Sequence, residues 1–166
     1  KPHGLNFNEN FEMLQKHAYA VTDKADGIRK LLMSLRNRSS ILTTDRLSTS
    51  ILTDISLDPG TVLDCEYIPE TREIFVFDIL YYQYEDVTMM NLYERHLLIY
   101  HVLSSMIQNT KFTIKQKTFY YSVHPDKMSI SSHPLVTKLH KDRPHNTIKF
   151  TEHIIETAID LWSNKD

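Results

Sequence analysis

The run IFVFDILYY constrains the fold of this chain more than any other part of its sequence. Its residues are apolar on both faces of a strand except for Asp78, and a strand with two apolar faces belongs in the interior of a sheet. The preceding pattern TVLDCEYI also alternates, with Leu63 and Cys65 on one face and Asp64 and Glu66 on the other. The short polar stretch PETRE separates the two runs. We therefore predict a hairpin that places an interior strand beside a strand with one acidic face.

Further strand patterns surround this hairpin. IRKLLMSL, SILTTDR and TSILTDI predict strands before it. The segment HAYAVTDK also alternates and would place Lys24 at a strand end, directly before a turn at Asp26 and Gly27. After the hairpin, FTIKQKTFYYSV predicts one strand with Lys115 and Lys117 on the same face. The chain is therefore expected to be rich in sheet.

Two segments change to helical periodicity. Between residues 89 and 108 apolar side chains recur every third or fourth position, which predicts an amphipathic helix of about twenty residues. Its expected buried face consists of Leu92, His96, Ile99, Leu103 and Met106, with His96 a structural histidine. The segment TEHIIETAIDLW predicts a second helix, capped by Thr151. Its expected buried residues are Ile154, Ile155, Ala158, Leu161 and Trp162. Residues 124–146 are predicted to form loops and short strand pieces.

The composition excludes several classes of protein. With 166 residues, of which 41% are hydrophobic, the chain is long enough for a domain with a real core. A net charge of −2 does not demand a nucleic acid or a membrane, and the single cysteine, Cys65, excludes an internal disulfide. Basic residues cluster between Lys111 and Arg143, which fits either a polyanion-facing wall or a solvated surface. Since we find no secretory signal, transmembrane run, zinc-ligand spacing or G-x-x-x-x-G-K loop, we expect a soluble protein.

Three short motifs occur in a telling order: KADGIR from Lys24 to Arg29, LDCE ending at Glu66, and FVFD ending at Asp78. In this order they resemble the motifs of the covalent nucleotidyltransferases, the superfamily of mRNA capping enzymes (RNA guanylyltransferases) and ATP-dependent polynucleotide ligases. K-x-D-G alone is weak, whereas the ordered set is far more specific. TTDR, ending at Arg46, and FTIKQKTFYY resemble capping enzymes more than ligases. The general pattern is most similar to the capping enzymes of large cytoplasmic DNA viruses.

This resemblance implies a fold and its limits. It implies an α+β, antiparallel-sheet-rich nucleotidyltransferase domain of the ATP-grasp-like ligase and capping type, with flanking helices. Residues 1–166 would be one partial domain, truncated before the family's later strand motifs and its OB-fold domain. The rest of the same capping polypeptide, or a second subunit, would supply the missing groups, which puts the activity of the chain on its own in doubt. The family pattern has glycine where Cys65 stands, so the packing around that position must differ.

The resemblance also implies a reaction. Lys24 would attack the α-phosphate of GTP, release pyrophosphate and pass the bound GMP to the 5′-diphosphate end of an RNA. A lysine amine has a reference pKa of about 10.4, so nearby cations must lower it before the amine can act as a nucleophile. Mg²⁺ or Mn²⁺ is the implied cofactor. The remaining implied roles are ribose or phosphate contacts from Arg29 and Arg46, a ribose or metal contact from Glu66, base stacking by Phe77, and a hydrogen bond from Lys117 to guanine O6.

Other interpretations remain open. Strand parity does not separate Phe75 from Phe77 as the stacking residue. A ligase charged with AMP would use Lys24 in the same way, with no role for Lys117 in selecting guanine. A truncated scaffold that binds a partner would leave Lys24 as a turn lysine, Glu66 and Asp78 as ion-paired structural acids, and the phenylalanines as core. For the capping enzyme we expect a cytoplasmic location, in a host cell or a virion if the protein is viral, and no membrane partner.

Overall fold

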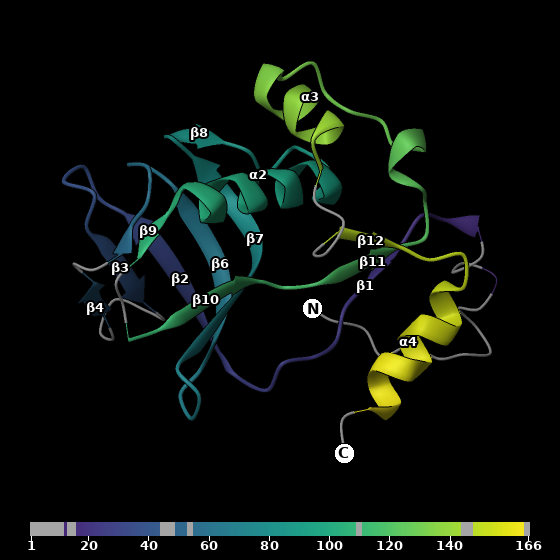
Figure 1. Cartoon of the computed structure of the whole chain (residues 1–166), viewed down its shortest axis with the longest axis horizontal. Helices are drawn as coiled ribbons and strands as arrows, with labels where there is room; N and C mark the ends of the chain where they lie inside the picture. Colours follow the sequence, from purple (N-terminus) through teal and green to yellow (C-terminus); the bar gives the residue numbers. More distant parts are fainter. Residues whose placement is uncertain are drawn as a thin grey trace. The chain divides into compact units, whose positions relative to one another are not determined.

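The computed structural model describes residue 12 and residues 16–43, 49–52, 55–108, 111–143 and 148–164 (Figure 1). These residues form an α+β structure that is rich in sheet, as predicted at that level. The chain divides into two compact units. Unit 1 contains residues 1–24, 118–129 and 145–166, and unit 2 contains residues 25–117 and 130–144. Each unit has a sheet of its own.

The main sheet of unit 2 has seven strands, in the order β10-β7-β6-β2-β3-β4, with β8 paired to β7 beside this path. Neighbouring strands are antiparallel except β10, which runs parallel to β7. Because β7 lies between β6 and β10, the predicted interior strand is confirmed. A separate pair is formed by β5 and β9. The bounds are β2 Ile28–Ser34, β3 Ser40–Thr43, β4 Thr49–Leu52, β5 Ile55–Ser56, β6 Val62–Ile68, β7 Glu73–Tyr82, β8 Glu85–Asp86, β9 Ile107–Gln108 and β10 Thr113–Gln116.

Helix α2 (Leu92–Ser105) packs against β7 and β10 (Figure 1). It begins later than predicted because Asn91 caps it, accepting a hydrogen bond from the Glu94 amide while the Glu94 side chain accepts one from the Asn91 amide. It also ends earlier, since β9 follows it. The buried arc is wider than the predicted stripe, since α2 also packs against α3 (Pro134–Lys141). The buried side chains are Tyr93, Glu94, His96, Leu97, Leu98, Ile99 and Val102, whereas Leu92, Leu103 and Met106 are only half-buried.

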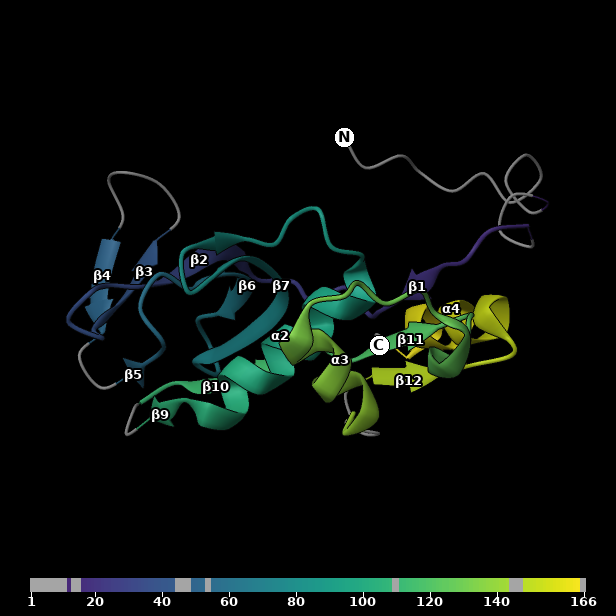
Figure 2. The same cartoon turned by 90° about the horizontal axis from the view of Figure 1, so that it is seen from above.

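Unit 1 is built on a small sheet with the order β1-β11-β12, in which β11 and β12 are parallel. Helix α4 (Ile154–Ser163) packs against β1 and β11 of this sheet (Figure 2). The strands are β1 Ala20–Val21, β11 Phe119–Tyr121 and β12 Ile148–Phe150, and the short helix η1 covers Pro125–Lys127.

Two strand predictions were wrong in extent. The segment from residue 17 to residue 24 was predicted to be one strand, but β1 ends at Val21, so Lys24 is not at a strand end. FTIKQKTFYYSV was predicted to be continuous, but it forms β10 and β11, which belong to different sheets. The chain leaves the β7 edge after Lys117, and Thr22 Oγ1 donates a 2.7 Å hydrogen bond to the Thr118 carbonyl. The alternation of side chains along a strand does not predict such a change of partner strand.

Two helical predictions also need correction. Within the described part of the chain no residue of α4 is buried, and Trp162 is 78% exposed. The predicted cap Thr151 is not the N-cap residue, which is His153; Thr151 Oγ1 instead accepts a hydrogen bond from the His153 amide. The predicted loop region contains η1 and α3. Among the described helices, none combines the length and the apolar character needed to cross a membrane.

Candidate functional site

Four strands of unit 2 present a row of directly paired residues. Arg29 of β2 pairs with Glu66 of β6, Glu66 pairs with Phe75 of β7, and Phe75 pairs with Lys115 of β10. Directly paired residues project from the same face of a sheet. The predicted alternation of β6 is confirmed, because Leu63 and Cys65 are fully buried on the core face. The sheet therefore carries a face on which motif residues from separate segments lie side by side.

The two carboxylate oxygens of Glu66 face different parts of the chain. Oε1 accepts a 2.9 Å hydrogen bond from the Gly27 amide. Oε2 lies 4.0 Å from Nζ of Lys117, and the side chains of Glu66 and Lys117 are only 19% and 9% exposed. One carboxylate thus joins the K-x-D-G segment to the residue that follows β10. Glu66 therefore links three segments of unit 2 that are far apart in the sequence.

Gly27 is required by a close approach and not by its backbone angles. A Cβ built on Gly27 would lie 2.6 Å from both the Tyr67 carbonyl oxygen and Ile68 Cδ1. Among the described glycines only Gly60 has a positive φ, of 76°. The turn predicted at Asp26 and Gly27 does not join two paired strands, because β1 pairs with β11 while β2 pairs with β3 and β6. Gly27 instead lets the backbone reach the end of β6.

Arg29 is held by a second acid of the LDCE motif. Its Nε donates to Asp64 Oδ1 at 2.9 Å and its Nη2 donates to Asp64 Oδ2 at 2.5 Å. The Arg29 side chain is 74% exposed, whereas that of Asp64 is 4% exposed. The hydrogen bonds that Arg29 donates to Asp64 raise the pKa of its guanidinium, which stays charged. Since a guanidinium has five N–H groups, Arg29 can still donate to an anion from its exposed side.

Asp78 of the FVFD motif is half-buried and has the structural partner that such an acid needs. Its Oδ1 accepts from Arg95 Nε at 2.7 Å, its Oδ2 accepts from Arg95 Nη2 at 3.2 Å, and Oδ1 also accepts from the Ile79 amide at 2.8 Å. The neighbouring helix residue, His96, donates from Nε2 to the Phe77 carbonyl at 3.0 Å. His96 is therefore a structural histidine, as predicted. Burial lowers the pKa of His96 to about 4, which keeps it neutral.

The strand register distinguishes the two phenylalanines that parity leaves equivalent. Cys65 pairs with Val76 and Asp64 pairs with Asp78, so the register shifts between them and Phe77 has no direct partner on β6. Phe75 lies directly opposite Glu66. Either ring can still serve as the stacking residue, but only Phe75 belongs to the paired row.

Cys65 does not disturb the acidic face. Its side chain points into the core and is fully buried, and Sγ donates to the Lys30 carbonyl at 3.2 Å. Burial raises the pKa of the Cys65 thiol to about 12, so it remains protonated at neutral pH. The core accommodates this side chain in place of the family's glycine.

The predicted site residues are only partly brought together. Unit 2 contains Arg29, Glu66, Phe77 and Lys117, of which Glu66 and Lys117 face each other. Lys24 is an exposed residue at the end of the first segment of unit 1, and Arg46 lies outside the described residues. Two residues were missed as contributors. Asp64 is part of the LDCE motif, so the motif could have indicated it. The helical periodicity gives no signal for Arg95, because that pattern identifies only the apolar face.

Among the described residues of the candidate site, a single carboxylate is available to bind a metal ion. In the described ranges no group of three His, Cys, Asp or Glu side chains could hold an ion. Both Asp64 oxygens are engaged by Arg29, which leaves Glu66. One carboxylate fits Mg²⁺ only where substrate phosphates and water supply the other ligands, which is the usual arrangement for this ion with nucleotides.

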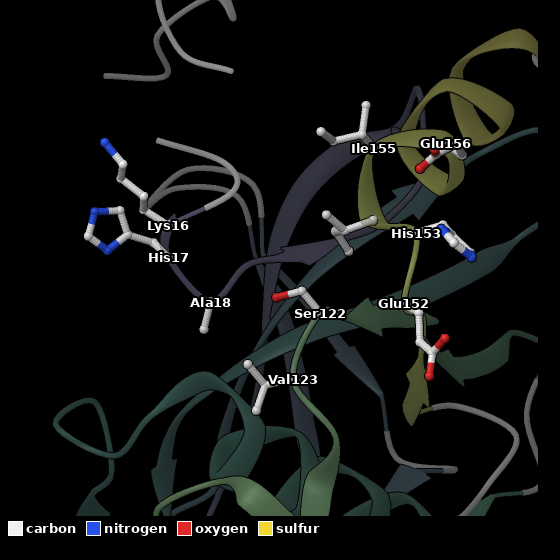
Figure 3. Close-up of a pocket in the computed structure, with 10 residues that line it drawn as sticks. Lys16, His17, Ala18, Ser122, Val123, Glu152, His153, Ile155 and Glu156 are labelled. Carbon is white, nitrogen blue, oxygen red and sulfur yellow. The ribbon is translucent and has the colours of Figure 1, made fainter. Parts of the chain in front are cut away.

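Unit 1 contains a separate pocket of about 590 Å³ (Figure 3). It lies between the segment before β1, the end of β11 and the start of α4, and its lining includes Lys16, Ser122, Glu152 and His153. Ser122 Oγ is already bonded to the Tyr19 amide at 2.9 Å. The predicted site residues do not line this pocket, and we assign it no function.

Comparison with known protein families identifies the class. The model of the mRNA capping enzyme catalytic domain matches residues 2–157, so the chain belongs to that family. This match confirms the resemblance drawn from the ordered motifs.

The similar proteins are viral. The mRNA-capping enzymes of two African swine fever virus isolates are each 37% identical to this chain over 65 residues. That of a third isolate is 35% identical over 65 residues. The aligned stretch is 39% of this chain and 7% of each relative, so the match covers a small part of their length.

Proposed function

We propose that this chain carries the nucleotide-charging site of an mRNA guanylyltransferase. Membership of the capping-enzyme family supports this proposal. The structural observation that carries it is the Glu66 carboxylate, which bonds the Gly27 amide of the K-x-D-G segment and faces Lys117. A carboxylate that is largely shielded from water costs free energy unless it has partners, and Glu66 has one from each segment.

The proposed reaction has two steps. The unprotonated Nζ of Lys24 attacks the α-phosphorus of GTP and forms a P–N bond, the bond from that phosphorus to the bridging oxygen of the β-phosphate breaks, pyrophosphate leaves, and the nitrogen releases one proton to water. The resulting lysyl-GMP then transfers GMP to a terminal phosphate oxygen of an RNA with a 5′-diphosphate end, and Lys24 is regenerated. The first step needs a neutral amine, which cationic neighbours favour because they disfavour the ammonium.

Arg29 is suited to the phosphate role in this reaction. Asp64 fixes one side of its guanidinium through two hydrogen bonds, and the side chain remains 74% exposed. A fixed guanidinium loses less entropy when it binds phosphate, and it donates in a planar geometry that matches phosphate oxygens. We assign Arg46 a similar contact from the motif alone.

Glu66 would hold Mg²⁺ or Mn²⁺ together with the triphosphate, and that ion would neutralise charge on the phosphates. In the absence of the ion, Lys117 balances the charge of Glu66 across 4.0 Å. The proposed role of Lys117 toward the base is a hydrogen bond to guanine O6, which adenine cannot accept because it carries an amino group there. Phe77, or Phe75 in the paired row, would stack on the base.

The proposed partners follow from the same reaction. They are GTP, RNA with a 5′-diphosphate end, and the remainder of a capping polypeptide or a second subunit. We propose the cytoplasm of a host cell, or a virion, as the site of action.

The proposal is tested by covalent labelling. The chain, and any longer capping polypeptide that contains it, is incubated with Mg²⁺ and with GTP or ATP labelled at the α-phosphate. We expect acid-labile protein label from GTP, complete loss of label in Lys24→Ala, and full label in Lys16→Ala, which removes another exposed lysine of unit 1. Label from ATP alone would move the assignment to a ligase. No label from either nucleotide would contradict an enzymatic role and favour a partner-binding scaffold.

A further inference from the structure

We infer that Arg95 of α2 is a positioning residue for the nucleotide site, and that it acts by occupying Asp78 so that Arg29 stays with Asp64. This inference rests on the proposed function, because it assigns Arg29 to the nucleotide. Arg95 itself does not belong to any of the three motifs. Its effect on the nucleotide is indirect, through the two aspartates.

The starting point is an unfavourable pair of charges. Asp64 and Asp78 are directly opposite each other on β6 and β7. Like charges in directly opposed positions of a sheet destabilise it unless other groups compensate. Both side chains are largely shielded, with exposed fractions of 4% for Asp64 and 22% for Asp78. Each aspartate therefore needs a cation of its own.

The structure supplies one arginine for each aspartate. Arg29 approaches Asp64 through Nε and Nη2, and Arg95 approaches Asp78 through Nε and Nη2. The arrangement is a row of alternating charges, in the order Arg29, Asp64, Asp78, Arg95. Its two ends differ, because the Arg29 side chain is 74% exposed while that of Arg95 is 17% exposed. Arg29, at the exposed end, can bind a ligand. Arg95, at the shielded end, can only keep the row of charges in place.

Helix α2 fixes the position of Arg95, at the shielded end of this row of alternating charges. Arg95 Nη1 also donates to the Met90 carbonyl at 2.5 Å, and His96 donates to the Phe77 carbonyl at 3.0 Å. Two consecutive helix residues therefore bind two consecutive residues of β7, at the point where the register shifts. Such shifts re-aim side chains, and here the shift places Asp78 opposite Asp64.

Loss of Arg95 would leave Asp78 without its cation. The charge of Asp78 already acts on Arg29, whose pKa it raises together with the larger effect of Asp64. Asp78 would then compete with Asp64 for the Arg29 guanidinium and draw it away from the orientation that leaves its outer N–H groups exposed. Phosphate binding would weaken although neither Arg29 nor Asp64 had changed.

The test is a set of three variants, Arg95→Leu, Asp78→Asn and Arg95→Leu/Asp78→Asn, with Arg36→Leu as control. Arg36 is an exposed arginine in the loop after β2, so its replacement changes charge by the same amount. GTP affinity is measured by titration and thermal unfolding by calorimetry. We expect Arg95→Leu to weaken GTP binding on the order of tenfold, equivalent to about 1.4 kcal/mol. The double variant should recover to within about threefold of wild type, because the competing charge is gone.

A purely structural role for Arg95 gives a different pattern. The double variant would then bind GTP no better than Arg95→Leu, and GTP affinity would follow thermal stability across the set. Either that result, or wild-type affinity in Arg95→Leu, would overturn the inference.

A second measurement works without nucleotide. The Nε–H resonance of Arg29, followed by NMR in the unliganded chain, should shift in Arg95→Leu and return in the double variant. If wild type binds no GTP while this pattern holds, the proposed function fails and the positioning of Arg29 by Arg95 stands. If wild type binds GTP and the resonance does not respond to Arg95→Leu, the inference fails and the proposed function stands.

Discussion

The two acids of the LDCE motif bind different parts of the chain. Asp64 holds the guanidinium of Arg29, and Glu66 holds the backbone of Gly27 and faces Lys117. Cys65 between them points to the opposite face, into the core. Because successive side chains of a strand alternate, one short motif can present two acids to a site while its middle residue stabilises the sheet.

Gly27 provides a direct test of the Glu66 contact. Gly27→Ala would bring a methyl group to 2.6 Å from the Tyr67 carbonyl, which is backbone and cannot move cheaply. We expect the free energy of unfolding to fall by about 1–3 kcal/mol and GTP affinity to fall with it, as the segment moves away from β6. Ala25→Ser, which changes a nearby residue of the same segment, should leave both unchanged. Chemical denaturation and GTP titration measure these effects, and a fully stable Gly27→Ala variant would contradict the close approach.

At the scale of single residues, the sequence predicts some contacts better than others. The alternation of LDCE correctly separates Asp64 and Glu66 from the core residues, because side-chain parity is a local property of a strand. The pairing of Asp78 with Arg95 could not be predicted, because those residues are on different elements and their contact depends on how α2 docks. The roles of Lys24, Arg46 and Lys117 come from family resemblance and stay predictions.

At the scale of elements, α2 and β7 form the support of the site. His96 and Arg95 bind consecutive residues of β7, so the docking of this helix fixes the register shift that orients Asp78. The docking includes a buried neutral histidine. Its protonation would put a positive charge in a buried environment, which burial disfavours.

This buried histidine makes stability depend on pH. The pKa of His96 is about 4 in the folded chain, against 6.5 in the unfolded chain, so the unfolded chain binds more protons between these values. The free energy of unfolding should therefore be highest above pH 6.5 and fall by up to about 3 kcal/mol as the pH drops toward 4. Urea unfolding across this range should show a weaker pH dependence in His96→Gln.

The control for this effect is His101→Gln, which changes a half-buried histidine of the same helix. That variant should keep the wild-type pH dependence. If His96→Gln and wild type lose stability in parallel as the pH falls, the account of His96 is incorrect.

Elements were predicted best where local pattern and tertiary partner agree. IFVFDILYY became the interior strand β7 because a run with two apolar faces needs cover on both sides. FTIKQKTFYYSV kept a strand pattern through Lys117 and Thr118, although the chain changes sheets there. The α4 pattern correctly predicted a helix but not its exposure, since periodicity shows which face is apolar and not what covers it.

At the scale of the whole molecule, the chain passes between the two units four times, after residues 24, 117, 129 and 144. Two of these crossings fall at Lys24 and Lys117, the predicted nucleophile and the predicted base-reading residue. No sequence pattern predicted this division, because it depends on contacts between distant segments. The family match over residues 2–157 spans both units.

The central claim is that Lys24 becomes covalently guanylylated, and mapping the adduct tests it most directly. The protein is incubated with GTP and Mg²⁺, digested under conditions that preserve phosphoramidates, and analysed by tandem mass spectrometry. The account predicts a GMP adduct on Lys24 that is lost after mild acid, and no AMP adduct on Lys24 when ATP replaces GTP. A GMP adduct on another lysine, with Lys24 unmodified, would contradict it.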